Sequence, residues 1–359
     1  MRQLIGLTVV AVALTLPTSL TAQEGLPAEL TPTGLLRTGF EFESQEAGRN
    51  DGFIVYDARL GLSGRVGIVF DYTLGFEYDR DDEEIALLDA ILSFPLGQSS
   101  VHIDVGGFRS PFSREATVDK GRLPFVERSQ ATLALAPGRQ LGLQVRGDGL
   151  ESRLTWAAGL FNGNGLRLEN DDDSFLAAGR AVFNSIGDVE FFEDFVLEAG
   201  VSFATTHDGS QSVLPVGFGF VDYEGDRLMV GADVRLSYRG WSLAGEILRT
   251  EYDDSPGFSD VNAEGVTADL RYMLWGVFDV GVRYDGFRPA LAAGAGDPER
   301  NEFLVLGLGV APGLYAQVGM QYAIGLNGTI QGVQDPLDGT NTAPALTDGQ
   351  FLLFLQVAF

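Results

Sequence analysis

A strict alternation of apolar and polar side chains constrains the fold of this chain more than any other feature. Between Val66 and Tyr78 every even-numbered residue is apolar or aromatic, and the residues between them include Asp71, Gly75 and Glu77. Successive side chains of a β-strand point to opposite faces, so this pattern predicts a strand with one apolar and one polar face.

The same alternation recurs in about sixteen segments, the first near 34–44 and the last near 350–359. In segment 53–63, for example, it places Tyr56 and Ala58 on the apolar face. Aromatic residues near the predicted strand ends are typical of the girdles at the two membrane interfaces, although ordinary core aromatics would give the same pattern. These residues are Tyr78, Tyr238, Trp241, Tyr272, Trp275 and Tyr284.

Short and long connections alternate between the predicted strands. Tight breaks occur at Gly64, 95–97, 147–149, Gly240, Gly276 and 312–313, and long polar connections occur at 109–138, 162–174, 206–227, 252–262, 288–301 and 325–349. The connection at 185–194 is longer than this alternation predicts. Short turns at one end and long loops at the other are typical of outer-membrane barrels. We therefore predict an all-β fold, a transmembrane up-and-down antiparallel β-barrel of about 16 strands that leaves no strand edge open to lipid.

The first 22 residues predict a secretory signal peptide. Arg2 precedes an apolar run from Leu4 to Leu16, and the segment ends in the small residue Ala22. We therefore expect a signal peptide at 1–22 and a barrel at 23–359. The chain has no cysteine, which excludes disulfides and thiolate metal sites. No later run of about 18 apolar residues predicts a membrane-spanning helix.

The last predicted strand ends on Phe359, and alternate residues back to Phe351 are apolar. A terminal aromatic on such a strand resembles the signal that the assembly machinery of bacterial outer-membrane barrels recognises. Leu352 and Phe354 make the opposite face apolar as well. We therefore expect another segment to pack inside the barrel against this strand.

The polar faces of the predicted strands carry acids and arginines, often two residues apart, as in Asp57 and Arg59. So many charges require a hydrated lumen, because a dry core would not hold them. They could form structural salt bridges or a wall that orients solutes. The arginines predicted to line this wall are Arg59, Arg146, Arg153, Arg180, Arg235, Arg271 and Arg283.

Residues 109–139 form a basic island with six cations and three acids, a net charge of +3, in a chain whose net charge is −26. Lys120 is the only lysine of the chain. We predict that four charged residues tie this segment to the barrel wall, namely Arg109, Glu127, Arg128 and Arg139.

Four short motifs resemble, in order and spacing, those of the phosphate-selective porin O/P family. They are Gly107 to Ser113 (GFRSPFS), Phe125 to Ser129 (FVERS), Ala136 to Gly142 (APGRQLG) and Gly159 to Gly163 (GLFNG). The resemblance implies a trimeric, sixteen-stranded outer-membrane porin in which loop 109–138 folds inward as the constriction. It also implies that lumenal arginines and a constriction lysine attract phosphate. Lys120, Arg122 and Arg114 lie in the loop where that role belongs.

These observations predict an outer-membrane porin of a Gram-negative-type bacterium that passes small hydrophilic solutes and prefers anions, phosphate among them. A general or cation-preferring porin is the alternative, favoured by the acidic total charge. An enzyme on the same barrel would need a constellation such as His102 with Asp104, but a single histidine near an acid is expected by chance. Acidic runs at 79–84 and 171–173 do not have the spacing of a calcium loop.

The acidic composition argues against nucleic acid as a partner. No motif predicts a cofactor or a metal site. The partners that we expect are outer-membrane lipid and lipopolysaccharide, the assembly machinery and two further copies of the chain.

Overall fold

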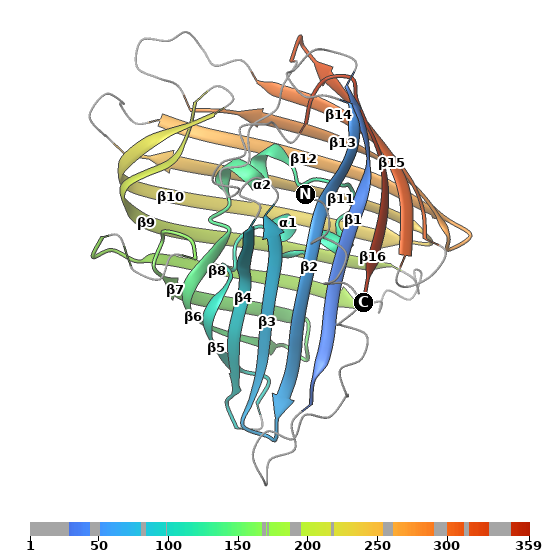
Figure 1. Ribbon diagram of the computed structural model, residues 1–359. Helices are drawn as coiled ribbons and strands as arrows, with labels where there is room; N and C mark the ends of the chain where they lie inside the picture. Colours follow the sequence, from blue (N-terminus) through green and yellow to red (C-terminus); the bar gives the residue numbers. More distant parts are fainter. Residues whose placement is uncertain are drawn as a thin grey trace, which may run out of the picture.

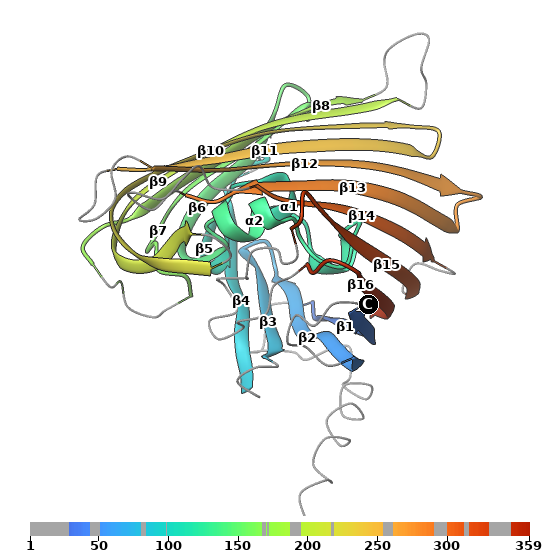
Figure 2. The ribbon, with the colours of Figure 1, turned by 90° about the horizontal axis from the view of Figure 1, so that it is seen from above.

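A ring of antiparallel strands makes up nearly all of the molecule. The computed structural model describes residues 29–43, 51–79, 84–97, 99–166, 170, 172–186, 195–216, 219–253, 261–290, 300–311, 316–329 and 346–359. Within these ranges sixteen strands close into one barrel in which each strand pairs with its neighbours in the sequence. Figure 1 shows this ring from the side and Figure 2 from above. The predicted fold class is confirmed.

The strands are β1 (Thr31–Glu43), β2 (Gly52–Val66), β3 (Phe70–Asp79), β4 (Glu84–Pro95), β5 (His102–Arg109), β6 (Arg139–Gly149), β7 (Leu154–Phe161), β8 (Leu176–Ile186), β9 (Val196–Val216), β10 (Gly219–Tyr238), β11 (Trp241–Tyr252), β12 (Val261–Leu274), β13 (Phe278–Arg288), β14 (Asn301–Val310), β15 (Ala316–Leu326) and β16 (Gln350–Ala358).

The barrel closes between its first and last strands. β1 pairs with both β2 and β16, and Arg37 lies opposite Asp57 on one side and Gln356 on the other. Gly34 and Phe359 exchange two backbone hydrogen bonds of 2.9 and 3.0 Å. The terminal aromatic therefore fixes the seam at which no strand edge is left unpaired.

Tight turns at one end of the barrel set the register of neighbouring strands. Between β10 and β11, Arg239 and Gly240 both have positive φ, 46° and 86°, and connect Tyr238 directly to Trp241. A two-residue turn with this backbone matches the natural twist of paired strands. Tyr238, Trp241 and Tyr272 meet on the outer face here, where the rings of Trp241 and Tyr272 lie 4.5 Å apart.

Three details differ from the sequence prediction. The first is the place of two tight turns. β2 continues past Gly64 to Val66, so the segment predicted as one strand near 65–78 contains the turn 67–69, and β3 begins at Phe70. The turn predicted at 147–149 lies at 150–153.

The second difference is a bulge in β2. It shifts the register between Arg37 and Thr38, so that Tyr56 is left out of the residue pairing with β1. Tyr56 therefore packs with Val126 and Leu352 inside the barrel instead of facing outward. A bulge adds one residue to a strand and so reverses the alternation beyond it, which a strict period of two does not reveal.

The connection predicted at 206–227 is mostly strand. β9 and β10 continue as a paired hairpin as far as Val216 and Gly219, well beyond their neighbours. The hairpin bends at its end, as Figure 2 shows at the left, and Ala290 donates a 2.8 Å backbone hydrogen bond to Pro215. The unusual connection at 185–194 lies almost entirely outside the described residues, as does the predicted signal peptide.

The connection between β5 and β6 lies inside the ring, as Figures 1 and 2 show. It contains α1 (Arg114–Thr117), a 3₁₀ turn η1 (Lys120–Arg122) and α2 (Gln130–Leu135). Ser113 and Ser129 cap the two helices by accepting from the backbone N–H groups of Ala116 and Thr132. None of the helices among the described residues is long and apolar enough to span a membrane.

Candidate functional site: the loop inside the barrel

Apolar packing holds α2 against the inner wall. All six residues of α2 are buried. Three of them, Ala131, Ala134 and Leu135, join a cluster that includes Phe112 and Phe287. Ala131 lies so close to β12 that a Cβ added at Gly265 would be 2.3 Å from its Cβ. This helix therefore packs on the bare backbone of the wall, and only glycine allows the approach.

Two further apolar contacts fix the middle of the loop. Phe125 packs with Phe303 and Val305, and Val126 packs with Leu352 and Phe354. The second contact explains why the last strand is apolar on its inner face, and it confirms that another segment packs there. Complete burial of a side chain of this size stabilises the folded state by about 1.5–3 kcal/mol.

Acidic side chains of the wall accept hydrogen bonds from the N-terminal ends of both short helices. The carboxylate of Glu246 on β11 accepts from the backbone N–H groups of Arg114 and Glu115, at 2.7 and 3.3 Å. The carboxylate of Asp285 on β13 accepts from the backbone N–H of Gln130 at 3.1 Å. Helix N-termini present unpaired N–H groups, so these two acids satisfy donors that would otherwise be buried without partners.

Arg283 on β13 joins the wall to the loop with four contacts. Its guanidinium pairs with Asp269 at 2.8 Å and with Glu115 at 2.6 Å, and it donates to the carbonyl of Glu127 at 3.1 Å. It also stacks over the ring of Phe125, 4.5 Å from the centroid. Burial raises the pKa of Glu115, but Arg283 and the hydrogen bonds from Ser129 outweigh it and lower that pKa from 4.5 to about 2.

A second charged contact involves Asp57 on β2, whose side chain is completely buried. Arg37 lies 2.5 Å from it, Lys120 3.2 Å and Arg59 3.3 Å, so three cations share one carboxylate. Arg37 also donates to the carbonyl of Val126. Burial lowers the pKa of Lys120, but Asp57, with Glu127, more than offsets this and raises it above its usual value. Lys120 therefore stays charged and is engaged with the wall.

The predicted anchors act in different ways. Arg139 forms a two-pronged contact with Asp89 of β4, at 3.0 and 3.2 Å, where the loop rejoins the barrel. Arg128 donates to the carbonyls of Glu115 and Val118 and so stiffens the loop itself. Glu127 accepts from Arg283 through its backbone carbonyl, and its carboxylate helps to keep Lys120 charged.

Arg109 and Arg122 differ from the other cations of the island. Neither forms a hydrogen bond or an ion pair with any residue that the structure describes. Arg122 is exposed. Arg114 lies 3.8 Å from Asp269 and is mostly buried. Of the three residues predicted to face the solute, Arg122 is thus unpaired, whereas Lys120 and Arg114 lie beside wall carboxylates.

Most of the arginines predicted on the lumen wall pair with an acid of a neighbouring strand. Arg59 with Glu77, Arg283 with Asp269 and Arg235 with Glu198 are directly opposed in the register. Arg146 pairs with Asp104 and Arg271 with Asp279, also on neighbouring strands. Arg180 on β8 pairs with Asp233 on β10, across β9. Arg153 lies in the turn before β7, where it is exposed.

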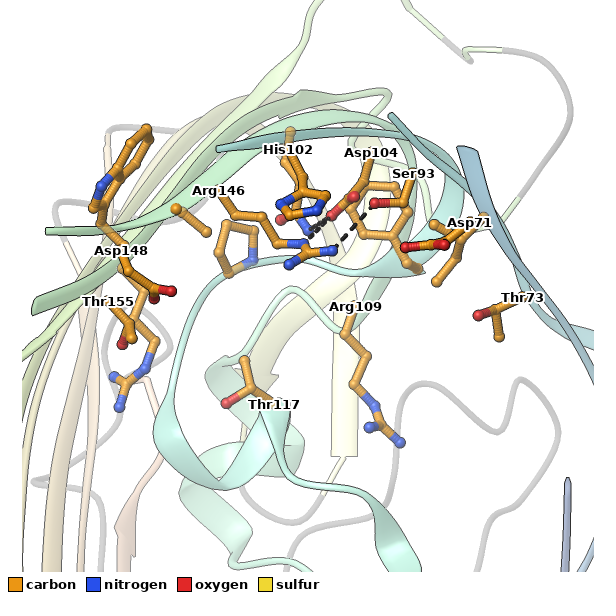
Figure 3. Close-up of a pocket in the computed structure, with 18 of the residues that line it drawn as sticks. Asp71, Thr73, Ser93, His102, Asp104, Arg109, Thr117, Arg146, Asp148 and Thr155 are labelled. Atoms are coloured by element: carbon orange, nitrogen blue, oxygen red, sulfur yellow. Dashed lines mark hydrogen bonds and ion pairs between the residues drawn. The ribbon is translucent and has the colours of Figure 1, made fainter. Parts of the chain in front are cut away.

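Two cavities of about 780 and 600 Å³ lie beside the loop, in the half of the barrel that carries the short turns. Arg109, Arg146 and Thr117 line the larger one, and Arg122 and Arg59 line the smaller. Thr73 and Asp89 belong to both linings, so the cavities adjoin there. Figure 3 shows the larger cavity, with the Arg146–Asp104 pair above and the Arg109 side chain extending toward the loop.

The larger cavity gives no support to an enzyme active site built on His102 and Asp104. Nδ1 of His102 faces the carbonyl of Ser100 at 3.3 Å, and Asp104 accepts instead from Arg146 and Gln144. Within the described part of the chain no hydrogen bond connects His102 to Asp104 or to a serine hydroxyl. The arrangement needed for nucleophilic catalysis is therefore not assembled.

A closed sixteen-stranded barrel with a loop folded into its lumen defines the porin fold. Residues 37–207, from β1 into β9, match the family described as phosphate-selective porin O and P. The matched part contains all four motifs, in agreement with the resemblance seen in the sequence. A comparison with curated protein sequences gives no match.

Solved porins share the architecture at low sequence identity. The anion-selective porin from Comamonas acidovorans is 14% identical with a TM-score of 0.66, and the match covers 92% of this chain and 100% of that one. The trimer form of OmpT from Vibrio cholerae is also 14% identical, with a TM-score of 0.65 and coverage of 92% and 99%. The channel DcaP of Acinetobacter baumannii is 12% identical, with a TM-score of 0.59 and coverage of 96% and 100%. These likenesses establish the fold.

Proposed function

We propose that this protein is an outer-membrane porin through which small hydrophilic solutes diffuse passively. The apolar outer face suits lipid, because alternate residues such as Leu243, Ile247 and Leu270 are about half exposed there. The lumen is charged, and two cavities of about 780 and 600 Å³ lie on one side of the inward loop. The match to a porin family over 37–207 supports the same conclusion.

The preferred solutes of this channel are anions, and phosphate is the candidate that the family description suggests. The observation that carries this proposal is the surplus of cations around the loop. Arg37, Arg59 and Lys120 share the carboxylate of Asp57, and Arg59 also lies near Glu77 and Asp119. Arg109 and Arg122 add two cations that have no acid partner among the described residues, which gives the surplus. Rings of arginine and lysine select anions, and a narrow low-dielectric passage focuses their field.

A cation-preferring porin of the same build is the second candidate. The net charge of −26 favours it, as does Asp119, whose side chain is 64% exposed beside the loop. Charges beyond a Debye length of about 8 Å are screened at physiological salt, however. Selectivity therefore depends on the loop more than on the total charge.

We also propose the cellular setting that this function requires. Cleavage after Ala22 would release the exported chain, and the strand that ends on Phe359 would be recognised by the assembly machinery of a Gram-negative-type outer membrane. The trimeric form of a structural neighbour supports a homotrimer. Lipid and lipopolysaccharide would contact the outer wall.

The pore itself is tested by adding detergent-purified protein to planar bilayers. Uniform conductance steps, together with entry of small uncharged sugars into protein-loaded liposomes, are expected. Protein that is folded by its resistance to denaturing detergent but gives neither steps nor sugar entry would refute the proposed function. The sign of the zero-current potential then decides between the two candidates.

A further inference from the structure

Arg109 is an unneutralised cation inside the barrel. It is the last residue of β5, where the chain leaves the wall for the loop. It makes no hydrogen bond or ion pair with the described residues, and one of its terminal guanidinium nitrogens is completely buried. A buried charged donor without a partner is destabilising, so its presence requires a compensating role.

The surroundings of Arg109 increase its positive potential. Arg139, Arg128 and Arg59 add to the positive potential at Arg109, and Asp119 opposes them. Asp89 pairs with Arg139, and Glu77 and Asp119 pair with Arg59. Among the described residues no carboxylate lies within ion-pair distance of Arg109.

The cavity provides the space that a ligand of Arg109 needs. Three arginines line it, and two of them are neutralised, Arg146 by Asp104 and Arg180 by Asp233. Only Arg109 of these three has no carboxylate partner among the described residues. Figure 3 shows its guanidinium apart from the other labelled side chains, with Thr117 and Thr73 on either side of it.

We propose that Arg109 binds the permeating solute directly, and that the ligand is a small oxyanion, a phosphate or a carboxylate. A guanidinium presents paired N–H donors in a plane that matches two oxygens of such an anion, whereas chloride offers no such match. Lys120 has the opposite role, because its ammonium group is taken up by Asp57 and fixes the loop. This inference rests on the proposed porin function and names the residue that gives it chemical selectivity.

The proposal is tested by measuring the phosphate concentration that halves the chloride current through single channels in planar bilayers. Arg109→Gln should raise this concentration about tenfold or more, the size expected for losing charge-assisted hydrogen bonds. Arg109→Lys should retain the sign of the KCl zero-current potential but weaken the block by phosphate, because lysine lacks the planar fork. Arg146→Gln is the matched control, because it removes the same charge from the same cavity but from a guanidinium that Asp104 already neutralises and that is 45% exposed. It should change the half-blocking concentration less than about twofold.

Three results keep this inference separate from the proposed function. A non-conducting wild-type protein would refute the proposed function itself, and a cation-selective one would refute its preference for anions. An anion-selective wild type whose block survives Arg109→Gln, or is lost equally in Arg146→Gln, would overturn only the role of Arg109. Acetate used in place of phosphate should show the same loss in Arg109→Gln, since both ligands are oxyanions. Resistance to denaturing detergent shows whether each variant is folded, and Arg109→Gln should fold because it removes no hydrogen bond or ion pair with the described residues.

Discussion

Replacing Arg283 should release the loop from the wall. In Arg283→Gln the carboxylates of Asp269 and Glu115, whose side chains are only 6% and 4% exposed, lose their shared cation. The carbonyl of Glu127 loses a donor and Phe125 loses a stacked guanidinium. Removing one partner of a buried ion pair typically costs about 3–5 kcal/mol, and this residue serves two pairs at once. We therefore expect the free energy of unfolding to fall by at least about 3 kcal/mol.

Two assays measure this loss. Chemical unfolding of the barrel in detergent gives the free energy of unfolding, and single-channel recording reports the loop through current noise and brief closures. Arg235→Gln is the matched control, because Arg235 also pairs with a wall acid, Glu198 at 3.3 Å, but is 45% exposed. An exposed ion pair contributes up to about 1 kcal/mol to stability. The control should therefore keep the current noise of the wild type and be nearly as stable. Equal effects of the two substitutions would refute the conclusion that Arg283 holds the loop.

Three further predictions concern the loop and the hairpin. Gly265→Val should displace α2 and raise current noise, because even a Cβ would lie 2.3 Å from Ala131. Gly245→Val on the outer face is the control and should leave the noise unchanged. A Gly265→Val channel with wild-type noise would contradict the packing of α2 on the wall. The folded pKa of Glu115, about 2, lies below its usual 4.5, so its hold on the loop is complete above about pH 4.5 and is lost as pH falls toward 2. Current noise should rise over that range in the wild type, and Glu115→Gln should remove this pH dependence; an unchanged dependence would contradict the assignment. Tyr252→Phe deletes the 3.0 Å hydrogen bond to the backbone of β9 and should destabilise the β9–β10 hairpin by about 1 kcal/mol. The amides at the end of the hairpin should then exchange faster. Unchanged exchange would show that this bond does not hold the hairpin.

The sequence predicted the barrel because its signal is local. A strand such as β3 displays its two faces within ten residues, and no distant information is needed to recognise it. The apolar inner face of β16 also predicted an inward segment, and Val126 supplies it. The bulge at Tyr56 could not be predicted, because one added residue reverses which side chains face inward without changing the composition of the strand.

The anchors of the loop could not be predicted from local pattern. Arg283 and Glu115 are 168 residues apart in the chain, and Asp285 and Gln130 are 155 apart. Which wall residue meets which loop residue depends on the register of all strands between them. The role predicted for Lys120 likewise came from the family resemblance, whereas its contact with Asp57 depends on where η1 lies in the closed ring.

The central claim is that the basic loop, rather than the acidic total charge, sets the selectivity of the channel. The zero-current potential across a KCl gradient tests it most directly, because its sign reports which ion crosses more easily. The account predicts the sign of chloride preference for the wild-type channel, which should grow at low salt as screening weakens. A potential of the opposite sign, that of potassium preference, would contradict it.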